Sequence, residues 1–253
     1  MVGATQPCPF VIKSENKKME VMNDIKKTQV DCTGVNSYVG QWNKYFDVEG
    51  NLAEHLKSIT YNQSLRGCHF RSVCWRVFLN CLPPNINEWT EALSKSRNEY
   101  DIIKEKHKML PNNETQNVDV ENPLSQSDQS VWKQYFQDQD LRNIIERDVK
   151  RTFPEMDYFS KEDVRRTMET ILFCYAREHI KLSYRQGMHE LLAPILFVLH
   201  CDLQGAFHAQ DIGELPKIIQ TLFQGKYVEN DAYTMFCHLM AATNSWYSVN
   251  EVE

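Results

Sequence analysis

Apolar residues recur at intervals of three and four along most of the chain from Trp42 onward, a spacing that places them on one face of an α-helix. Leu52, Leu56 and Ile59 begin the series. The sets that follow are Phe70, Val73, Cys74, Val77, Phe78 and Cys81; Trp89, Leu93, Tyr100 and Ile103; Tyr135, Phe136, Leu141, Ile144, Ile145 and Val149; Val164, Met168, Ile171, Leu172 and Tyr175; and Tyr233, Phe236, Leu239 and Met240. Because no stretch alternates convincingly between apolar and polar residues, the sequence predicts an all-α fold.

Several residues are typical of helix ends or of helix distortion. Pro83 and Pro84 are expected to end the helix before them, and Asn87 to cap the helix after them. Residues 160–163 resemble a capping box, with aspartate in place of the commoner glutamate. Pro194 is expected to kink the apolar helix that contains it. The most apolar stretch, residues 191–201, is shorter than a bilayer requires, so we expect a buried helix and no transmembrane segment.

Polar stretches suggest how the chain is organised. Residues 1–37 are polar, rich in lysine and without period, and are predicted to be a disordered lead-in. Residues 110–130 form a polar loop, which is either a tolerated insertion or a tip that binds a partner. The rest, residues 38–253, is predicted to be one helical domain that contains this loop.

Composition narrows the classes of function. The formal net charge is −6 and no basic stripe is present, which argues against a nucleic-acid partner. The eight cysteines show neither a C-x-x-C pair nor spacing typical of a metal site, so we expect free thiols, no metal and a reducing, cytoplasmic setting. Residues 1–10 lack the pattern of a secretory signal.

Asp148 and Arg151 form a first unusual pair. Asp148 continues the apolar stripe of residues 141, 144 and 145, where a carboxylate is costly unless it is paired. Arg151 lies one turn further on the same side, at the expected end of the helix before Pro154. Spacing alone favours a structural ion pair with a buried cation.

The second unusual segment is Tyr184-Arg185-Gln186-Gly187-Met188. Gly187 gives a permissive backbone at the junction of a loop and a helix, so Gln186 is expected at the rim, pointing outward. The glutamine could instead satisfy a backbone group.

The residues argue against two kinds of hydrolase site. His189 and Glu190 begin an H-E-x-x-H pattern, but Ala193 stands where the second histidine should be, so His189 is read as a helix-start residue. A nucleophile built on Cys174 and His179 lacks support, because Cys174 lies on a largely apolar helix.

Three segments, taken in order, resemble the signature segments of the TBC domain, a family that activates Rab GTPases. They are the R-x-x-x-W run from Arg71 to Trp75, the I-x-x-D-x-x-R run from Ile145 to Arg151, and the Y-x-Q run from Tyr184 to Gln186. Each run is weak alone, but the ordered set is specific. The resemblance covers roughly Trp42 to Trp246.

The resemblance implies that Arg151 is an arginine finger and that Gln186 positions the attacking water in the site of a partner Rab. It makes Asp148 the residue that orients Arg151. Arg71, Trp75, Tyr184 and Gly187 become structural support, with Arg71 a second possible partner for Asp148. The chain would then be an activator and not an enzyme in its own right. GTP and magnesium would belong to the Rab, in keeping with the lack of a G-x-x-x-x-G-K-[ST] loop.

The resemblance also implies a role in endosomal traffic, with a late-endosomal Rab and retromer as partners of a cytoplasmic protein recruited to endosomes. The family domain continues beyond its Y-x-Q run, so the expectation is a truncated domain with weak activity and an exposed apolar patch near Phe236, Leu239 and Trp246. The alternative is an interaction scaffold in endosomal traffic without catalytic function.

Overall fold

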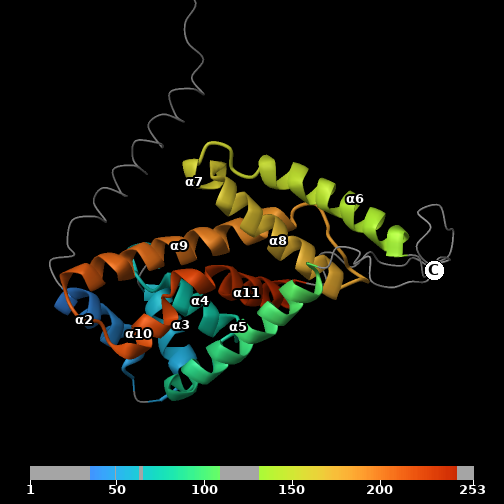
Figure 1. Ribbon diagram of the computed structural model, residues 1–253. Coiled ribbons are helices and arrows are strands. Elements are labelled where there is room, and N and C mark those ends of the chain that lie inside the picture. Colours follow the sequence, from blue (N-terminus) through green and yellow to red (C-terminus); the bar gives the residue numbers. More distant parts are fainter. Residues whose placement is uncertain (1–34, 49, 63–64, 109–130, 244–253) are drawn as a thin grey trace, which may run out of the picture.

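Helices and short 3-10 turns, without a strand, make up the part of the chain that the computed structural model describes, which is residues 35–48, 50–62, 65–108 and 131–243 (Figure 1). The all-α prediction is therefore confirmed. The α-helices are α2 (Val35–Phe46), α3 (Leu52–Asn62), α4 (Arg71–Phe78), α5 (Trp89–Lys106), α6 (Val131–Lys150), α7 (Asp157–Ser160), α8 (Glu162–Glu178), α9 (Met188–Ile212), α10 (Lys217–Leu222) and α11 (Val228–Ala242). The 3-10 turns are η1 (Leu65–Gly67), η2 (Ile86–Glu88) and η3 (Gly225–Tyr227).

Helix α9 is the central element. It packs against α11, α4, α8, α2 and α6, and Figure 1 shows it running from α8 at one end to α2 at the other. Its 25 residues are long and apolar enough to cross a membrane by length and composition, although 50% of its most apolar window is buried inside the protein. The predicted short buried stretch is thus part of a longer helix that neighbouring helices surround.

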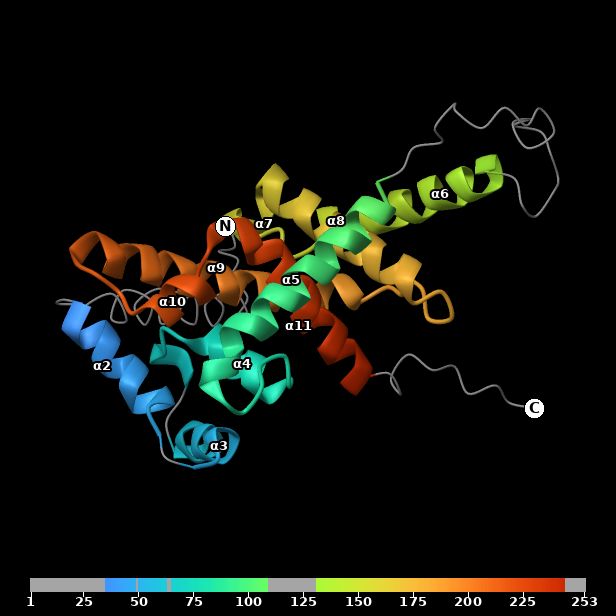
Figure 2. The same cartoon turned by 60° about the horizontal axis from the view of Figure 1, so that its bottom comes forward.

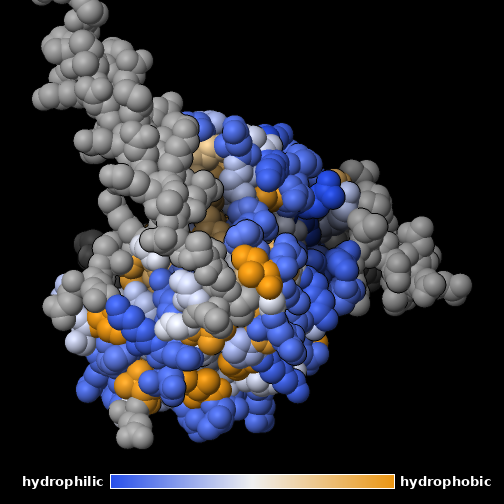
Figure 3. All heavy atoms as spheres, turned by 90° about the vertical axis from the view of Figure 1, so that its left-hand side faces the viewer, coloured by the Kyte–Doolittle hydropathy of each residue, from blue (hydrophilic) through white to orange (hydrophobic). Residues whose placement is uncertain are grey.

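The core has two parts, one toward each end of α9. The first part joins α6, α8 and α11 to the N-terminal half of α9, with Ile145, Ile171 and Leu192 fully buried. The second part joins α2, α3, α4 and α10 to the C-terminal half of α9. At the end of the molecule that carries α2, Figure 3 shows small groups of apolar residues separated by hydrophilic ones.

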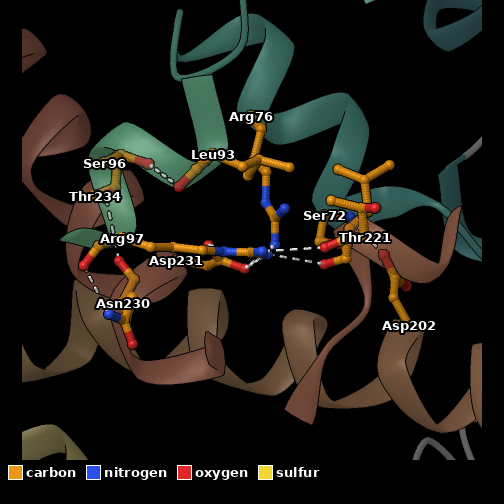
Figure 4. A network of polar contacts seen from close by, with 11 residues as sticks. Ser72, Arg76, Leu93, Ser96, Arg97, Asp202, Thr221, Asn230, Asp231 and Thr234 are labelled. Carbon is orange, nitrogen blue, oxygen red and sulfur yellow. Dashed lines mark hydrogen bonds and ion pairs between the residues drawn. The ribbon is translucent and has the colours of Figure 1, made fainter. Parts of the chain in front are cut away.

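A buried ionic network, which no pattern in the sequence indicates, joins α4, α5 and α11. Arg97 donates two hydrogen bonds to the Asp231 carboxylate, both of 2.9 Å, and Arg76 donates a third of 3.1 Å (Figure 4). Arg97 also reaches the backbone carbonyls of Thr221 and Leu222. Figure 2 shows α5 crossing α11, and the two helices are in contact where this network joins them.

The predicted helix caps are wrong. Helix α5 has Glu88 as its N-cap without a side-chain bond, because the 3-10 turn η2 precedes it and is itself capped by Asn85, whose side chain accepts from the Asn87 N–H at 3.1 Å. The capping box at residue 160 fails because Ser160 ends the short helix α7 and Lys161 takes the N-cap of α8.

The expected exposed patch near the end of the chain is also wrong where it can be tested. Phe236 is 0% exposed and packs edge-on against Tyr175, with ring centroids 5.1 Å apart, while Leu239 is half-buried against the same core. Trp246, most of the predicted lead-in and the loop at 110–130 lie outside the described residues. Within the lead-in, residues 35–37 are the start of α2.

Candidate functional site

Arg151 follows directly after the last residue of α6. Its Nη2 lies 2.8 Å from Oδ1 of Asp148, three residues earlier, and its side chain remains 53% exposed. The ion pair predicted from the spacing is therefore present. One nitrogen of the guanidinium pairs with the carboxylate, while the exposed remainder of the side chain can contact another molecule.

Asp148 contacts two segments at once. Its side chain is 12% exposed, and Ile145 and Val149 of the same helix are buried in the core. While Oδ1 binds Arg151, Oδ2 accepts a hydrogen bond of 2.8 Å from the Tyr184 hydroxyl. A single carboxylate thus joins the end of α6 to the loop that carries Gln186.

Two expectations about Asp148 are wrong. Its cationic partner is not buried, because Arg151 is half exposed. Arg71 is not its partner: the Arg71 Nε donates to the Leu65 carbonyl at 3.3 Å, and the neighbouring Ser72 N–H donates to Asp202 at 2.6 Å. Asp202 lies 13 residues beyond His189 on α9, and a rise of 1.5 Å per residue puts it about 20 Å from the Asp148 end.

Trp75 is half-buried and packs against the first part of the core. A structural role for Trp75 stays a prediction.

The backbone before α9 takes a shape that requires glycine. Gly187 is the N-cap of α9 with φ +97°, a region that residues with a side chain rarely adopt. Ser183 also has a positive φ, of 53°, and the Met188 N–H closes the turn on the Arg185 carbonyl at 3.1 Å. Gln186, at the tip of this turn, is exposed and makes no hydrogen bond within the described part of the chain. The outward position expected for Gln186 is therefore confirmed.

His189 is the residue that sequence reasoning missed. It is 1% exposed, and its Nδ1 lies 3.0 Å from the Tyr184 hydroxyl. Burial lowers the pKa of the His189 imidazole, and the nearby Asp148 carboxylate opposes this shift. The sequence signal that could have indicated His189 is its separation of five positions from Tyr184.

The Arg151 guanidinium and the Gln186 carboxamide are both exposed to solvent, while Asp148 and Tyr184 beside them are buried. The guanidinium supplies positive charge and several donors, and the carboxamide supplies both a donor and an acceptor. Among the described residues, no group of three His, Cys, Asp or Glu side chains is placed to hold a metal.

Residues 68–251 match the Rab-GTPase-TBC domain family. TBC1 domain family member 5 of Homo sapiens is 44% identical over 218 residues, which are 85% of this chain and 27% of that protein. TBC1 domain family member 5 homolog B of Dictyostelium discoideum is 34% identical over 213 residues, which are 82% of this chain and 21% of that protein. The chain thus spans about a quarter of the length of these relatives.

The fold has a solved counterpart in the crystal structure of the Ypt/Rab-GAP domain of Gyp1p. The two superpose with a TM-score of 0.57 at 17% identity, over 85% of this chain and 60% of that chain. The family match covers more than half of the chain and includes Arg71, Asp148, Arg151 and the turn before α9. The chain therefore belongs to the Rab-GTPase-TBC domain family.

Proposed function

We propose that this chain stimulates GTP hydrolysis by a Rab GTPase, with Arg151 and Gln186 entering the nucleotide site of the Rab. The observation that carries the proposal is the Asp148 carboxylate, which binds Arg151 through one oxygen and the Tyr184 segment through the other. Both finger residues remain exposed while their supports are buried.

Arg151 supplies charge neutralisation in this proposal. Phosphoryl transfer builds negative charge on the oxygens of the transferring group, and a guanidinium placed there lowers the barrier. The contact with Asp148 leaves further N–H groups of Arg151 free to face those oxygens.

Gln186 supplies a different function. Its carboxamide oxygen can accept a hydrogen bond from the attacking water, while its amide nitrogen donates to the γ-phosphoryl group. The tight turn at Gly187 holds the side chain at the start of α9 and limits the positions that it can take.

The direct test is a screen of single-turnover GTP hydrolysis by purified Rabs with and without the 253-residue chain. We expect a concentration-dependent acceleration for one Rab or a small group of Rabs. If no Rab in the panel is accelerated, the proposal is overturned. The remaining hypothesis is then that this domain is a non-catalytic interaction scaffold.

Replacing Gln186 by alanine is expected to lower the stimulated rate constant by about a hundredfold, the size seen when one transition-state hydrogen bond is removed. Because Gln186 is exposed, the melting temperature should not change. Gln139→Ala, which removes an exposed glutamine from α6, is the matched control and should leave the rate unchanged.

A Rab whose own switch glutamine is replaced distinguishes the source of the water-positioning group. If the chain supplies it, the replaced Rab is still stimulated by the wild-type chain. Loss of all stimulation with that Rab would assign the role to the GTPase and remove it from Gln186.

The sequence resemblance supports a narrower proposal about the partners. In this proposal the chain is cytoplasmic, is recruited to endosomes, and binds a late-endosomal Rab and retromer there. Including late-endosomal Rabs in the panel tests the first partner. A binding measurement between the chain and purified retromer tests the second, and no measurable affinity would remove it.

A further inference from the structure

We infer that His189 is a positioning residue: its Nδ1–H donates a hydrogen bond to Tyr184, and this bond completes the chain of contacts that fixes Asp148 and, through it, Arg151. The inference deepens the proposed function and rests on it for its kinetic test. A second, spectroscopic test does not depend on any Rab.

The direction of each hydrogen bond follows from the number of protons available. The Tyr184 hydroxyl has a single proton, and the Asp148 carboxylate at 2.8 Å can only accept. That proton therefore points to Asp148. The contact of 3.0 Å between the Tyr184 hydroxyl and His189 Nδ1 then requires that Nδ1 carry a proton and donate it to the tyrosine oxygen.

The geometry excludes a direct bond that would bypass Tyr184. His189 Nδ1 lies 3.9 Å from Asp148 Oδ2, which is beyond hydrogen-bond distance. The contacts therefore run in one order, from His189 to Tyr184, then to Asp148 and finally to Arg151. The first two contacts are hydrogen bonds and the last is an ion pair. Hydrogen bonds in series polarise one another, so a donor at His189 strengthens the bond from Tyr184 that fixes the carboxylate paired with Arg151.

Burial favours a neutral imidazole as the donor. It lowers the pKa of His189, and the cation Arg151 acts in the same direction, while the anions Asp148 and Glu190 oppose the shift. Glu190 Oε1 lies 3.7 Å from Nε2, so this second nitrogen makes no close hydrogen bond to it. A neutral imidazole leaves the Asp148–Arg151 pair balanced in charge.

His189 cannot act by touching the Rab, because it is 1% exposed. Removing its donor is therefore expected to lower kcat, through a less well-held Arg151, while the KM for the Rab stays unchanged. A purely structural role would instead lower the melting temperature without separating kcat from KM.

The kinetic test compares two replacements. His189→Leu removes the donor but still fills the buried site with a side chain of similar bulk. It should lower kcat about five- to tenfold, the usual consequence of one lost hydrogen bond. His189→Asn can place an amide N–H close to the position of Nδ1 and should restore kcat to within about twofold of wild type. Equal losses for both replacements would overturn the inference.

A double replacement tests whether His189 acts through Tyr184. Tyr184→Phe removes the hydroxyl that accepts from Nδ1, so adding His189→Leu to it should reduce kcat by less than about twofold further. Independent, multiplicative losses would show that the two residues act separately and would contradict the chain of contacts.

The spectroscopic test uses the 253-residue chain labelled with 15N-histidine. Long-range 1H–15N correlation should show the His189 imidazole protonated at Nδ1 and bare at Nε2 at neutral pH, and Tyr184→Phe should shift the Nδ1 signal. Protonation at Nε2 alone would overturn the inference even if the chain stimulates a Rab. The expected spectrum together with a failed Rab screen would uphold the hydrogen-bond chain and reject only the proposed function.

Discussion

Replacing Arg151 by alanine is expected to lower the stimulated rate of GTP hydrolysis by about a thousandfold or more, which is the contribution of an arginine finger in phosphoryl transfer. The side chain is 53% exposed, so its loss removes few packing contacts, and the melting temperature should stay close to that of wild type. Single-turnover hydrolysis with the Rab that responds in the screen measures the rate, and thermal unfolding measures the stability.

Arg151→Lys separates charge from shape. A lysine keeps the positive charge but loses the forked donors that can face a phosphoryl group and Asp148 at once, so little activity should return. Arg166→Ala on α8 is the matched control, because Arg166 is also exposed and lies 3.8 Å from a glutamate on its own helix. Full stimulation by Arg151→Ala would remove Arg151 from the catalytic assignment.

The largest effect on stability is expected for Asp231→Ala. Both Arg97 and Arg76 place a guanidinium on this carboxylate, and their side chains are 5% and 3% exposed. Removing the carboxylate leaves two buried cations without their counter-ion, and such losses cost about 3–5 kcal/mol. Since domains of ordinary stability have about 5–15 kcal/mol in total, the variant should be close to unfolding.

Urea unfolding followed by circular dichroism would measure the free energy of unfolding of this variant. Glu162→Ala is the control, because it breaks an exposed ion pair with Arg166 and should change the free energy by less than about 1 kcal/mol. If Asp231→Ala unfolded at the same urea concentration as the control, the network would not stabilise the junction of α4, α5 and α11.

Local features of this protein were predictable from its sequence. Helices α3, α5, α8 and α9 form where apolar residues recur at helical spacing, because that periodicity is a property of each segment by itself. The ion pair between Asp148 and Arg151 was predictable for the same reason, since residues three apart on a helix are neighbours. Gly187 marked a special backbone because its conformational freedom is intrinsic.

The predictions of the helix caps were wrong although a cap is a local feature, because each cap depends on how the preceding segment folds. Asn85 took the capping position before a 3-10 turn, and Ser160 became part of the short helix α7. A capping residue is defined by the backbone on both sides, and the sequence pattern described only one of them.

Tertiary structure alone decided which distant residues meet. Asp148 and Tyr184 are 36 positions apart in the sequence, and Arg97 and Asp231 are 134 positions apart. Separations of this length carry no periodic signal, so neither contact could be predicted from spacing. Helical periodicity shows which face of a segment is buried, but not what covers it. Phe236, expected at an exposed patch because the domain was predicted to be truncated, is fully buried against Tyr175. His189 does lie at the start of α9, as predicted, but only the tertiary structure shows that its imidazole is buried against the Tyr184 hydroxyl.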